Sequence, residues 1–280
     1  MPRNALDSTF RRLRGAVKTL DRPGGRTLLR AVASAGLTVK LRTPVLLRRR
    51  GDAWAYRWEG ATLPYPTLGT ALHPLEAKRI LLFDYVPKPG DIAFDVGAGV
   101  GDTTLVLSKL VGHDGRVVAI EAHPETYAWL SRTCALNDLP NVTTLQVAAS
   151  DREGSLLMSD ESSISNTLLT TQDGRDLEVP GRTIDGIASE LGIESIDFLK
   201  MNIEGAERLA LRGMERMIRR TRHVCISCHD FMADRGGPDE MRTKAFVSDF
   251  LMSRGFTLVE RTSRVDAIRS YVYGRNTLLS

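Results

Sequence analysis

Residues 91–104 have the types and spacing most suited to chemistry. They read DIAFDVGAGVGDTT, an apolar run followed by glycines at 97, 99 and 101 and then by the start of a helical pattern. Glycines in a strand–turn–helix connection let the backbone turn sharply and leave room for a ligand against the main chain. Such a turn alone is weak support for a ligand site, because it can also be an ordinary tight connection.

An acidic residue follows at the spacing of a nucleoside site. The next expected strand, 117–121, ends at Glu121, 24 residues after Gly97. A carboxylate at this place can accept hydrogen bonds from both hydroxyls of a ribose. The two features together favour a cofactor that contains a nucleoside.

The charges around the glycines favour S-adenosylmethionine over NAD. A dinucleotide site usually reads GxGxxG, with the pyrophosphate at the helix N-terminus. Here the third glycine comes one residue early, and the carboxylate of Asp102 would repel a diphosphate. Asp95 adds a negative charge that suits a ligand with a sulfonium and an ammonium group. An NAD-dependent dehydrogenase is therefore the less favoured alternative.

Further cofactor contacts are expected beside this turn and after the third strand. Asp151 follows that strand at a place where an acid can meet an adenine, and Ser150 could offer backbone contacts. His73 and Tyr85 could also border the cofactor. The full set of expected cofactor residues is Asp95, Gly97, Ala98, Gly99, Gly101, Thr103, Glu121, Ala122, Ser150 and Asp151.

Alternating strands and helices must position these residues. We expect strands over 92–96, 117–121, 142–147, 196–201, 224–227, 256–260 and 267–273, and helices over 74–85, 103–111, 124–136, 184–191, 206–218 and 240–254. Such alternation predicts a mostly parallel sheet covered by helices. Residues 154–182 break the rhythm and are expected to form an inserted hairpin or loop over one edge.

Composition divides the chain into two parts. Its 280 residues suit one globular domain plus an extension, and three cysteines are too few for a disulfide scaffold. Residues 1–50 hold 13 Lys and Arg against 2 Asp and Glu, whereas residues 51–280 hold 25 against 32. We expect a basic, partly helical extension with a short hairpin over 1–70, including a helix over 27–39 and a strand over 53–58, and the main domain over 71–280.

The basic residues 1–50 have three open interpretations: a solvated lead-in, a docking surface for an anionic membrane or acidic partner, and an organelle transit peptide. We see no secretory signal and no apolar run that could span a bilayer. We therefore expect a cytoplasmic protein, with a peripheral place on the inner face of the membrane if the basic extension docks there.

Several blocks in order resemble the FkbM-type methyltransferases over roughly residues 74–230. They are DVGAGVGDTT from Asp95, GRVVAIEAHP from Gly115, LNDLPNV from Leu136, ASDREG from Ala149, TID from Thr183 and IDFLKMNIEGAE from Ile196. The resemblance implies a class I methyltransferase fold, a Rossmann-like, doubly wound seven-stranded sheet whose last hairpin is antiparallel. It also implies transfer of a methyl group from S-adenosylmethionine to a hydroxyl of a sugar, glycolipid or other natural product.

The chain departs from the family pattern at Asn202. Relatives usually read KIDVEGAE where this chain reads KMNIEGAE, and an amide cannot accept a proton at neutral pH. Any role as base or metal ligand would be weaker, neutral or taken over by Glu204. A divalent metal could acidify the hydroxyl instead, but Asn202 makes a carboxylate-rich site less favoured, and no metal is predicted.

A second departure concerns the candidate base. Relatives often carry Glu-x-His after the fifth strand, whereas here the sequence is SCHD, with His229 followed by Asp230. We expect His229 to take the proton of the hydroxyl while Glu204 and Asn202 orient the acceptor. Glu207 is interpreted as a first-turn acid that stabilises the following helix.

The segment CISCH from Cys225 matches the pattern for covalent haem attachment. Side chains alternate along a strand, so Cys225 and Cys228 should point to opposite faces of the sheet. We interpret both cysteines as core residues or as residues near the site.

Two other classes remain as alternatives, an RNA methyltransferase and a non-catalytic protein that binds the cofactor. The acidic main domain and the lack of an Asn/Asp-Pro-Pro-aromatic sequence after strand 196–201 disfavour nucleic acid as a partner. We expect a small molecule or a lipid-linked glycan as acceptor.

Overall fold

The computed structural model describes residues 26–41, 44–51, 53–66, 79–159 and 176–279. Its contacts divide the chain into two units, the first ending at His73 and the second beginning at Pro74. No helix of the described residues is long and apolar enough to cross a membrane.

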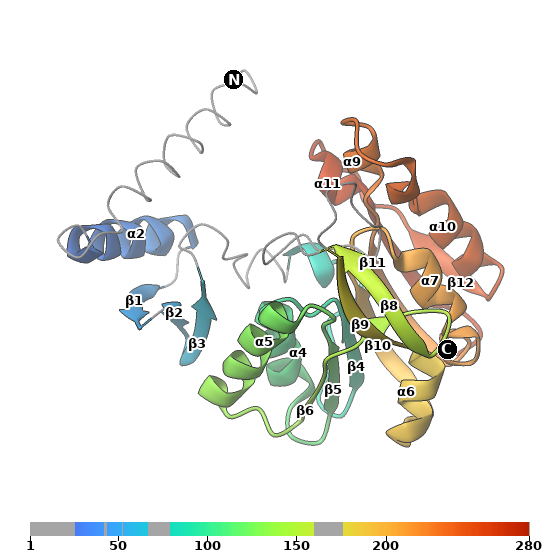
Figure 1. Ribbon diagram of the computed structural model, residues 1–280, viewed down its shortest axis with the longest axis horizontal. Helices are drawn as coiled ribbons and strands as arrows, with labels where there is room; N and C mark the ends of the chain where they lie inside the picture. The colour runs from blue at the N-terminus through green and yellow to red at the C-terminus, as the bar shows by residue number, and fades with distance from the viewer. Residues whose placement is uncertain (1–25, 42–43, 52, 67–78, 160–175, 280) are drawn as a thin grey trace. The chain divides into compact units, whose positions relative to one another are not determined.

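The described residues of the first unit form a helix, α2 (Arg26–Leu41), and a three-stranded antiparallel sheet of β1 (Leu46–Arg50), β2 (Ala53–Trp58) and β3 (Ala61–Tyr65) (Figure 1). The expected helix and strand are confirmed, but the short hairpin proves to be a three-stranded sheet. Aromatic side chains form its core, with Tyr56 and Tyr65 edge to face at 5.3 Å. In α2, the hydroxyl of Ser34 accepts the backbone N–H of Leu47 in β1, and that of Thr38 accepts the backbone N–H of Val45 just before β1.

The second unit is built on a seven-stranded sheet in the order β12-β13-β11-β10-β4-β5-β6. The strands are β4 (Ile92–Val96), β5 (Arg116–Ile120), β6 (Val142–Leu145), β10 (Ile196–Met201), β11 (Thr221–Ser227), β12 (Phe256–Val259) and β13 (Tyr271–Asn276). β13 runs antiparallel to both of its neighbours, and the other neighbouring strands of this sheet pair in parallel. The expected doubly wound α/β sheet with an antiparallel last hairpin is confirmed.

Helices cover both faces of this sheet (Figure 1). One face packs against α6 (Ile184–Glu190), α7 (Glu207–Arg212), α8 (Glu215–Ile218) and α10 (Lys244–Met252), and the other packs against α4 (Asp102–Val111) and α5 (Pro124–Asn137). Because the strands are buried on both faces, their apolar residues form nearly continuous runs. This pattern made them recognisable in the sequence.

Four predicted elements differ in the structure. The helix expected over 74–85 ends at residue 81, and its residues before 79 lie outside the described part of the chain. The helix expected over 206–218 is broken between α7 and α8 at Gly213, where the carbonyl oxygen of Ser150 lies so close that a side chain would be 1.8 Å from it. The helix expected over 240–254 is a 3-10 turn, η1 (Asp239–Met241), followed by α10. The strand expected from 267 begins only at Tyr271, after the short helix α11 (Asp266–Arg269).

Residues 154–182 form the expected insert. β8 (Gly154–Ser159) and β9 (Asp176–Arg182) are an antiparallel hairpin, and the short strand β7 (Ala148–Ala149) pairs with β9 in parallel. Residues 160–175 of the insert lie outside the described part of the chain.

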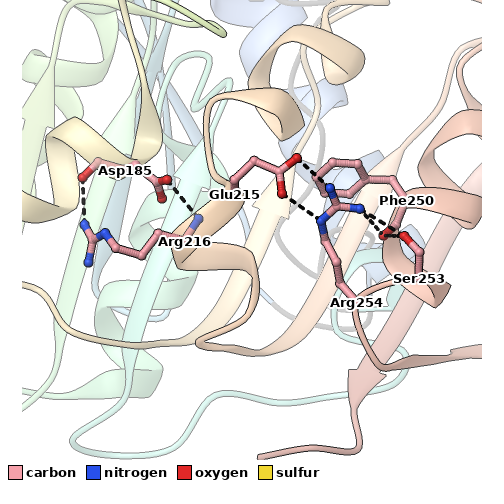
Figure 2. Close-up of polar contacts among 6 residues, drawn as sticks. All are labelled: Asp185, Glu215, Arg216, Phe250, Ser253 and Arg254. Carbon is pink, nitrogen blue, oxygen red and sulfur yellow. Dashed lines mark hydrogen bonds and ion pairs between the residues drawn. The ribbon is translucent and has the colours of Figure 1, made fainter.

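Polar contacts fasten the helices behind β10 and β11 (Figure 2). The Asp185 carboxylate of α6 accepts a hydrogen bond from the backbone N–H of Arg216 in α8. Arg254, just after α10, binds both carboxylate oxygens of Glu215 and places its guanidinium 3.4 Å from the ring centre of Phe250. These contacts hold three helices together on the face opposite α4.

Candidate functional site

The carboxyl ends of four parallel strands meet at one edge of the sheet. The register pairs Val96 of β4 with Ile120 of β5 and with Met201 of β10, and pairs Met201 with Ile226 of β11. The chain leaves β4 for β5 on one side and later returns through β10 on the other side. The order of the strands along the chain therefore reverses between β4 and β10. Ligands of open α/β sheets bind where the strand order reverses, at the carboxyl ends of the strands.

The three glycines of the turn after β4 have different surroundings. A side chain on Gly97 would lie 2.0 Å from the carbonyl oxygen of Asn202, and one on Gly101 would lie 2.9 Å from Leu130. At these two positions the protein itself takes the space that the sequence analysis assigned to a ligand. Gly99, with φ +58°, has no described atom within 4 Å of such a side chain. Of the three, Gly99 alone faces open space that a ligand can fill.

Asp95 does not present a free negative charge to a ligand, contrary to the sequence interpretation. The carboxylate is completely buried, lies 2.8 Å from Nζ of Lys200 and accepts a hydrogen bond from the hydroxyl of Thr104. The ammonium group of Lys200 also donates to the carbonyl oxygen of Gly97 at 2.6 Å. This buried ion pair fixes the turn after β4, and sequence reasoning did not identify Lys200.

Glu121 lies beside the open glycine. One carboxylate oxygen accepts the backbone N–H of Gly99 at 2.9 Å, and the other accepts that of His123 at 3.0 Å. Burial raises the pKa of Glu121, and these two N–H groups oppose the shift. A carboxylate can accept about four hydrogen bonds, so acceptor capacity remains for the hydroxyls of a ribose.

The other expected cofactor residues differ in accessibility. Ser150 is completely buried, its N–H donates to the carbonyl of Arg182 and its own carbonyl abuts Gly213, so the expected backbone contacts to a ligand are absent. Asp151 is half-buried, with its carboxylate 3.3 Å from the hydroxyl of Ser150. Ala98 is buried in the turn, Thr103 is buried in the first turn of α4, and Ala122 is half-buried after Glu121.

Tyr85 lies away from this edge. Its hydroxyl donates to Asp91, just before β4 begins, and its ring stacks on His223 near the start of β11. The expectation that Tyr85 borders the cofactor is therefore wrong, because the residue lies at the amino ends of the strands. His73 lies outside the described residues.

His229 lies between two carboxylates that follow β10. Its Nδ1 is 3.2 Å from Oε1 of Glu207, and its Nε2 is 3.3 Å from Oε2 of Glu204. The side chains of Glu207, His229 and Glu204 are 0%, 5% and 20% exposed. Burial would lower the pKa of His229, but the hydrogen bonds and charges of both glutamates outweigh it and raise this pKa to about 9. At neutral pH the ring is therefore a cation, which disagrees with its expected role as a neutral base.

The acidic partner of His229 is not the expected one. The carboxylate of Asp230 accepts the backbone N–H groups of Thr243 and Lys244 and so fixes the start of α10. Glu207, interpreted from the sequence as a helix-stabilising acid, contacts His229 instead. No helical spacing could have shown this pairing, because α7 begins only at Glu207 and Glu204 precedes it with a φ of +49°.

Two further groups complete this edge. The side-chain oxygen of Asn202 is buried and has no hydrogen-bond partner among the described residues. Tyr271 faces Ser227 across β13 and β11. Its pKa is raised to about 12, chiefly by burial, and the charges of Glu204 and Asp102 add to the shift.

The two cysteines of the haem-like motif lie on opposite faces of the sheet, as predicted. Cys225 packs with Ala93 and Phe198, whereas Cys228 belongs to the core on the α10 side. Within the described ranges, no three His, Cys, Asp or Glu side chains are placed to hold a metal ion.

The residues at this edge fit S-adenosylmethionine. The space at Gly99 can receive a ligand against the main chain, and Glu121 beside it can accept from ribose hydroxyls. The orphaned oxygen of Asn202 requires a donor, and the cofactor carries an ammonium group. Fold and site together define a Rossmann-like domain of the class that uses S-adenosylmethionine.

The family can also be stated. The Methyltransferase FkbM domain matches residues 95–258, more than half of the chain, and the chain belongs to this family. The fit of the residues at this edge to S-adenosylmethionine as cofactor agrees with this family.

Curated and solved proteins show more distant similarity. A probable cobalt-precorrin-6B C(15)-methyltransferase (decarboxylating) of Thermoplasma acidophilum is 27% identical over 90 residues, which are 31% of this chain and 45% of that protein. The matched segment thus spans less than half of this relative.

Two solved structures are similar in fold. Methyltransferase FkbM from Methylobacillus flagellatus is 18% identical, with 72% of this chain and 50% of that chain covered and a TM-score of 0.47. Fibrillarin of Aeropyrum pernix, with bound S-adenosyl-L-methionine, is 13% identical, with 83% and 99% covered and a TM-score of 0.45. These similarities do not define the acceptor.

Proposed function

We propose that this methyltransferase acts on a hydroxyl oxygen of a sugar, glycolipid or other natural product. The observation that carries the proposal is the cluster of Glu204, His229 and Glu207 at the same sheet edge as Glu121. A hydroxyl must lose its proton when its oxygen is methylated, and paired carboxylates and imidazoles are groups that move protons. S-adenosylmethionine supplies a methyl group that is already activated on a sulfonium.

The residues at the ends of β4 and β5 would hold the cofactor. Glu121 would accept from the ribose, and the main chain at Gly99 would pass beneath the ligand. Asp151 would face the adenine from the third strand, and Asn202 would accept from the ammonium group or from the acceptor hydroxyl. Lys200 holds the turn in place without facing the ligand, because its ammonium group is engaged by Asp95 and Gly97.

An aromatic ring beside the cluster supports a sugar acceptor. Phe231, in α9 (Asp230–Ala233), is half-buried and lies 6.0 Å from the ring of His229. The guanidinium of Arg235 lies 5.4 Å from the Phe231 ring. An apolar ring face next to a cation suits the carbon face of a sugar that carries an anionic substituent, such as the phosphate of a lipid-linked glycan.

Methyl transfer can be tested without knowledge of the acceptor. The small-molecule and lipid extracts of cells with and without the gene are compared by mass spectrometry, and purified protein with isotope-labelled S-adenosylmethionine is added back to the deficient extract. We expect a glycan or glycolipid to lose the mass of one CH2 group without the gene and to regain a labelled methyl on oxygen. Label that enters only RNA, and disappears on ribonuclease treatment, would contradict the proposal.

We also propose that the basic first unit binds an anionic membrane on the inner, cytoplasmic side, where a lipid-linked acceptor would lie. Val32, Ala35, Gly36 and Val39 follow the helical repeat along α2 and are exposed, with Val32 at 62% and Val39 at 79%. Arg30 is exposed on the same helix, and residues 1–50 carry eleven more basic than acidic residues. Apolar and basic side chains together suit anionic lipid headgroups.

Vesicle flotation tests this location. The full chain should float with phosphatidylserine-containing vesicles and not with pure phosphatidylcholine, and V32D/V39D should abolish flotation. The control is V265D, because Val265 is an equally apolar, exposed residue of the second unit. Unchanged flotation of V32D/V39D would refute the proposed surface.

A further inference from the structure

Both ring nitrogens of His229 face carboxylate oxygens. A neutral imidazole has one N–H, so its other nitrogen would place a lone pair against a carboxylate. Only the imidazolium can donate from Nδ1 to Glu207 and from Nε2 to Glu204 at the observed 3.2 and 3.3 Å. In this arrangement His229 has no lone pair with which to accept a proton.

We propose that Glu204, rather than His229, accepts the proton of the acceptor hydroxyl, and that Glu207 is a positioning residue that acts through His229. The proposal rests on hydroxyl methylation as the proposed function. In the step, the acceptor oxygen forms a bond to the methyl carbon, and the carbon–sulfur bond breaks with its electron pair remaining on sulfur. The hydroxyl proton passes to the Glu204 carboxylate, which becomes a neutral acid and later releases the proton to solvent.

Accessibility separates the two glutamates. The Glu207 side chain is fully buried and His229 nearly so, whereas Glu204 keeps a fifth of its side chain exposed. Of the three groups, Glu204 is the one that an acceptor at the sheet edge can reach. A carboxylate offers about four acceptor sites, so the contact with His229 does not exhaust its capacity.

The backbone at Glu204 supports a functional placement. Its φ is +49°, in the left-handed region that few residues other than glycine adopt. Such strained conformations cluster at active sites and are kept where the surrounding structure holds them. Here the next residue, Gly205, donates its N–H to Glu207 at 3.3 Å, so the segment that bends at Glu204 is tied to the buried carboxylate.

The neighbouring charges leave this pairing intact. Tyr271 of β13 lies at the same edge of the sheet. Burial raises its pKa to about 12, so its hydroxyl is neutral at pH 7.5. Asp230, the next residue after His229, has its carboxylate engaged at the start of α10. Glu204 and Glu207 are therefore the carboxylates that hold the charge of His229.

The charge of His229 is measured directly by ¹⁵N NMR of histidine-labelled protein, with the H229Q variant used to assign the signal. We expect both ring nitrogens to be protonated at pH 7.5, in the presence and absence of S-adenosylhomocysteine. A neutral ring at pH 7.5, with a lone pair on Nε2, would overturn the proposal because His229 could then be the base.

Kinetics with the deficient lipid extract as acceptor test the assignment of roles. We expect E204Q to lower kcat about 100-fold or more, the range of general base catalysis, while its affinity for S-adenosylhomocysteine changes less than about twofold. E207Q should lower kcat less than E204Q does. Activity should fall at alkaline pH as His229 loses its proton, and E207Q should move this fall to lower pH, because His229 then has one carboxylate partner fewer. E194Q, an exposed control at the amino end of β10, should match the wild type.

The outcomes distinguish this proposal from the proposed function. If H229Q is as inactive as expected for a lost base while E204Q retains its rate, Glu204 is not the proton acceptor. If the wild-type protein methylates nitrogen or carbon in the extract, hydroxyl methylation itself is wrong, whatever the NMR shows. Methylation of oxygen together with a neutral His229 overturns only the present proposal.

Discussion

The raised pKa of His229 predicts a measurable dependence of stability on pH. The pKa is about 9 in the folded protein against an ordinary value of 6.5. One pKa unit corresponds to about 1.4 kcal/mol, so the protonated ring contributes about 3 kcal/mol to the free energy of unfolding. The side chain is almost completely buried, so solvent screening reduces this value little.

The sign of the effect follows from proton binding. The folded protein binds the proton of His229 more tightly than the unfolded chain does, so this contribution is complete below about pH 6.5. It is lost as pH rises through about 9. Between pH 6.5 and 9.5 the wild-type protein should therefore lose about 3 kcal/mol more unfolding free energy than H229Q.

The assay is urea unfolding followed by circular dichroism at several pH values across this range. H113Q is the matched control, because His113 is 87% exposed and lies in the loop after α4. H113Q should follow the wild-type pH dependence, and only H229Q should flatten it. Parallel curves for the wild type and H229Q would refute a charged, doubly bonded His229.

Three further predictions concern the cofactor turn. G97A should lower the unfolding free energy by several kcal/mol, since its methyl group would overlap the carbonyl of Asn202, just after β10. G99A should cost about 1 kcal/mol for its positive φ and should weaken S-adenosylhomocysteine binding in calorimetry. Similar binding of S-adenosylhomocysteine by G99A and the wild type would contradict a ligand site against the main chain at Gly99. K200M should cost about 3–5 kcal/mol in urea unfolding by leaving Asp95 buried and unpaired, and adding D95N should recover part of it. E121A should reduce the affinity for S-adenosylhomocysteine at least tenfold while the circular dichroism spectrum stays unchanged. Equal affinity of E121A and the wild type would show that Glu121 does not bind the ribose.

Much of the fold could be predicted because local patterns agree with it. β2, β4 and β10 have the predicted bounds, since each is an apolar run between turn residues. The close contact at Gly213, between α7 and α8, could not be predicted, because the Ser150 carbonyl that makes it lies more than sixty residues away in the sequence.

The site was predictable in its residues but less so in their roles. The spacing of Gly99 and Glu121 pointed to neighbouring positions, and the structure joins them by a hydrogen bond. The pairing of Asp95 with Lys200 spans the junction of β4 and β10, which no local pattern shows. The charge of His229 depends on two carboxylates that approach both of its nitrogens, and this could be seen only after folding.

A crystal structure of the complex with S-adenosylhomocysteine would test the central claim most directly. The account predicts that the ribose hydroxyls bind the Glu121 carboxylate, that the ligand covers Gly99, and that the sulfur faces the space bordered by Glu204 and His229. A ligand bound at another edge of the sheet, or one whose sulfur points away from Glu204, would contradict it.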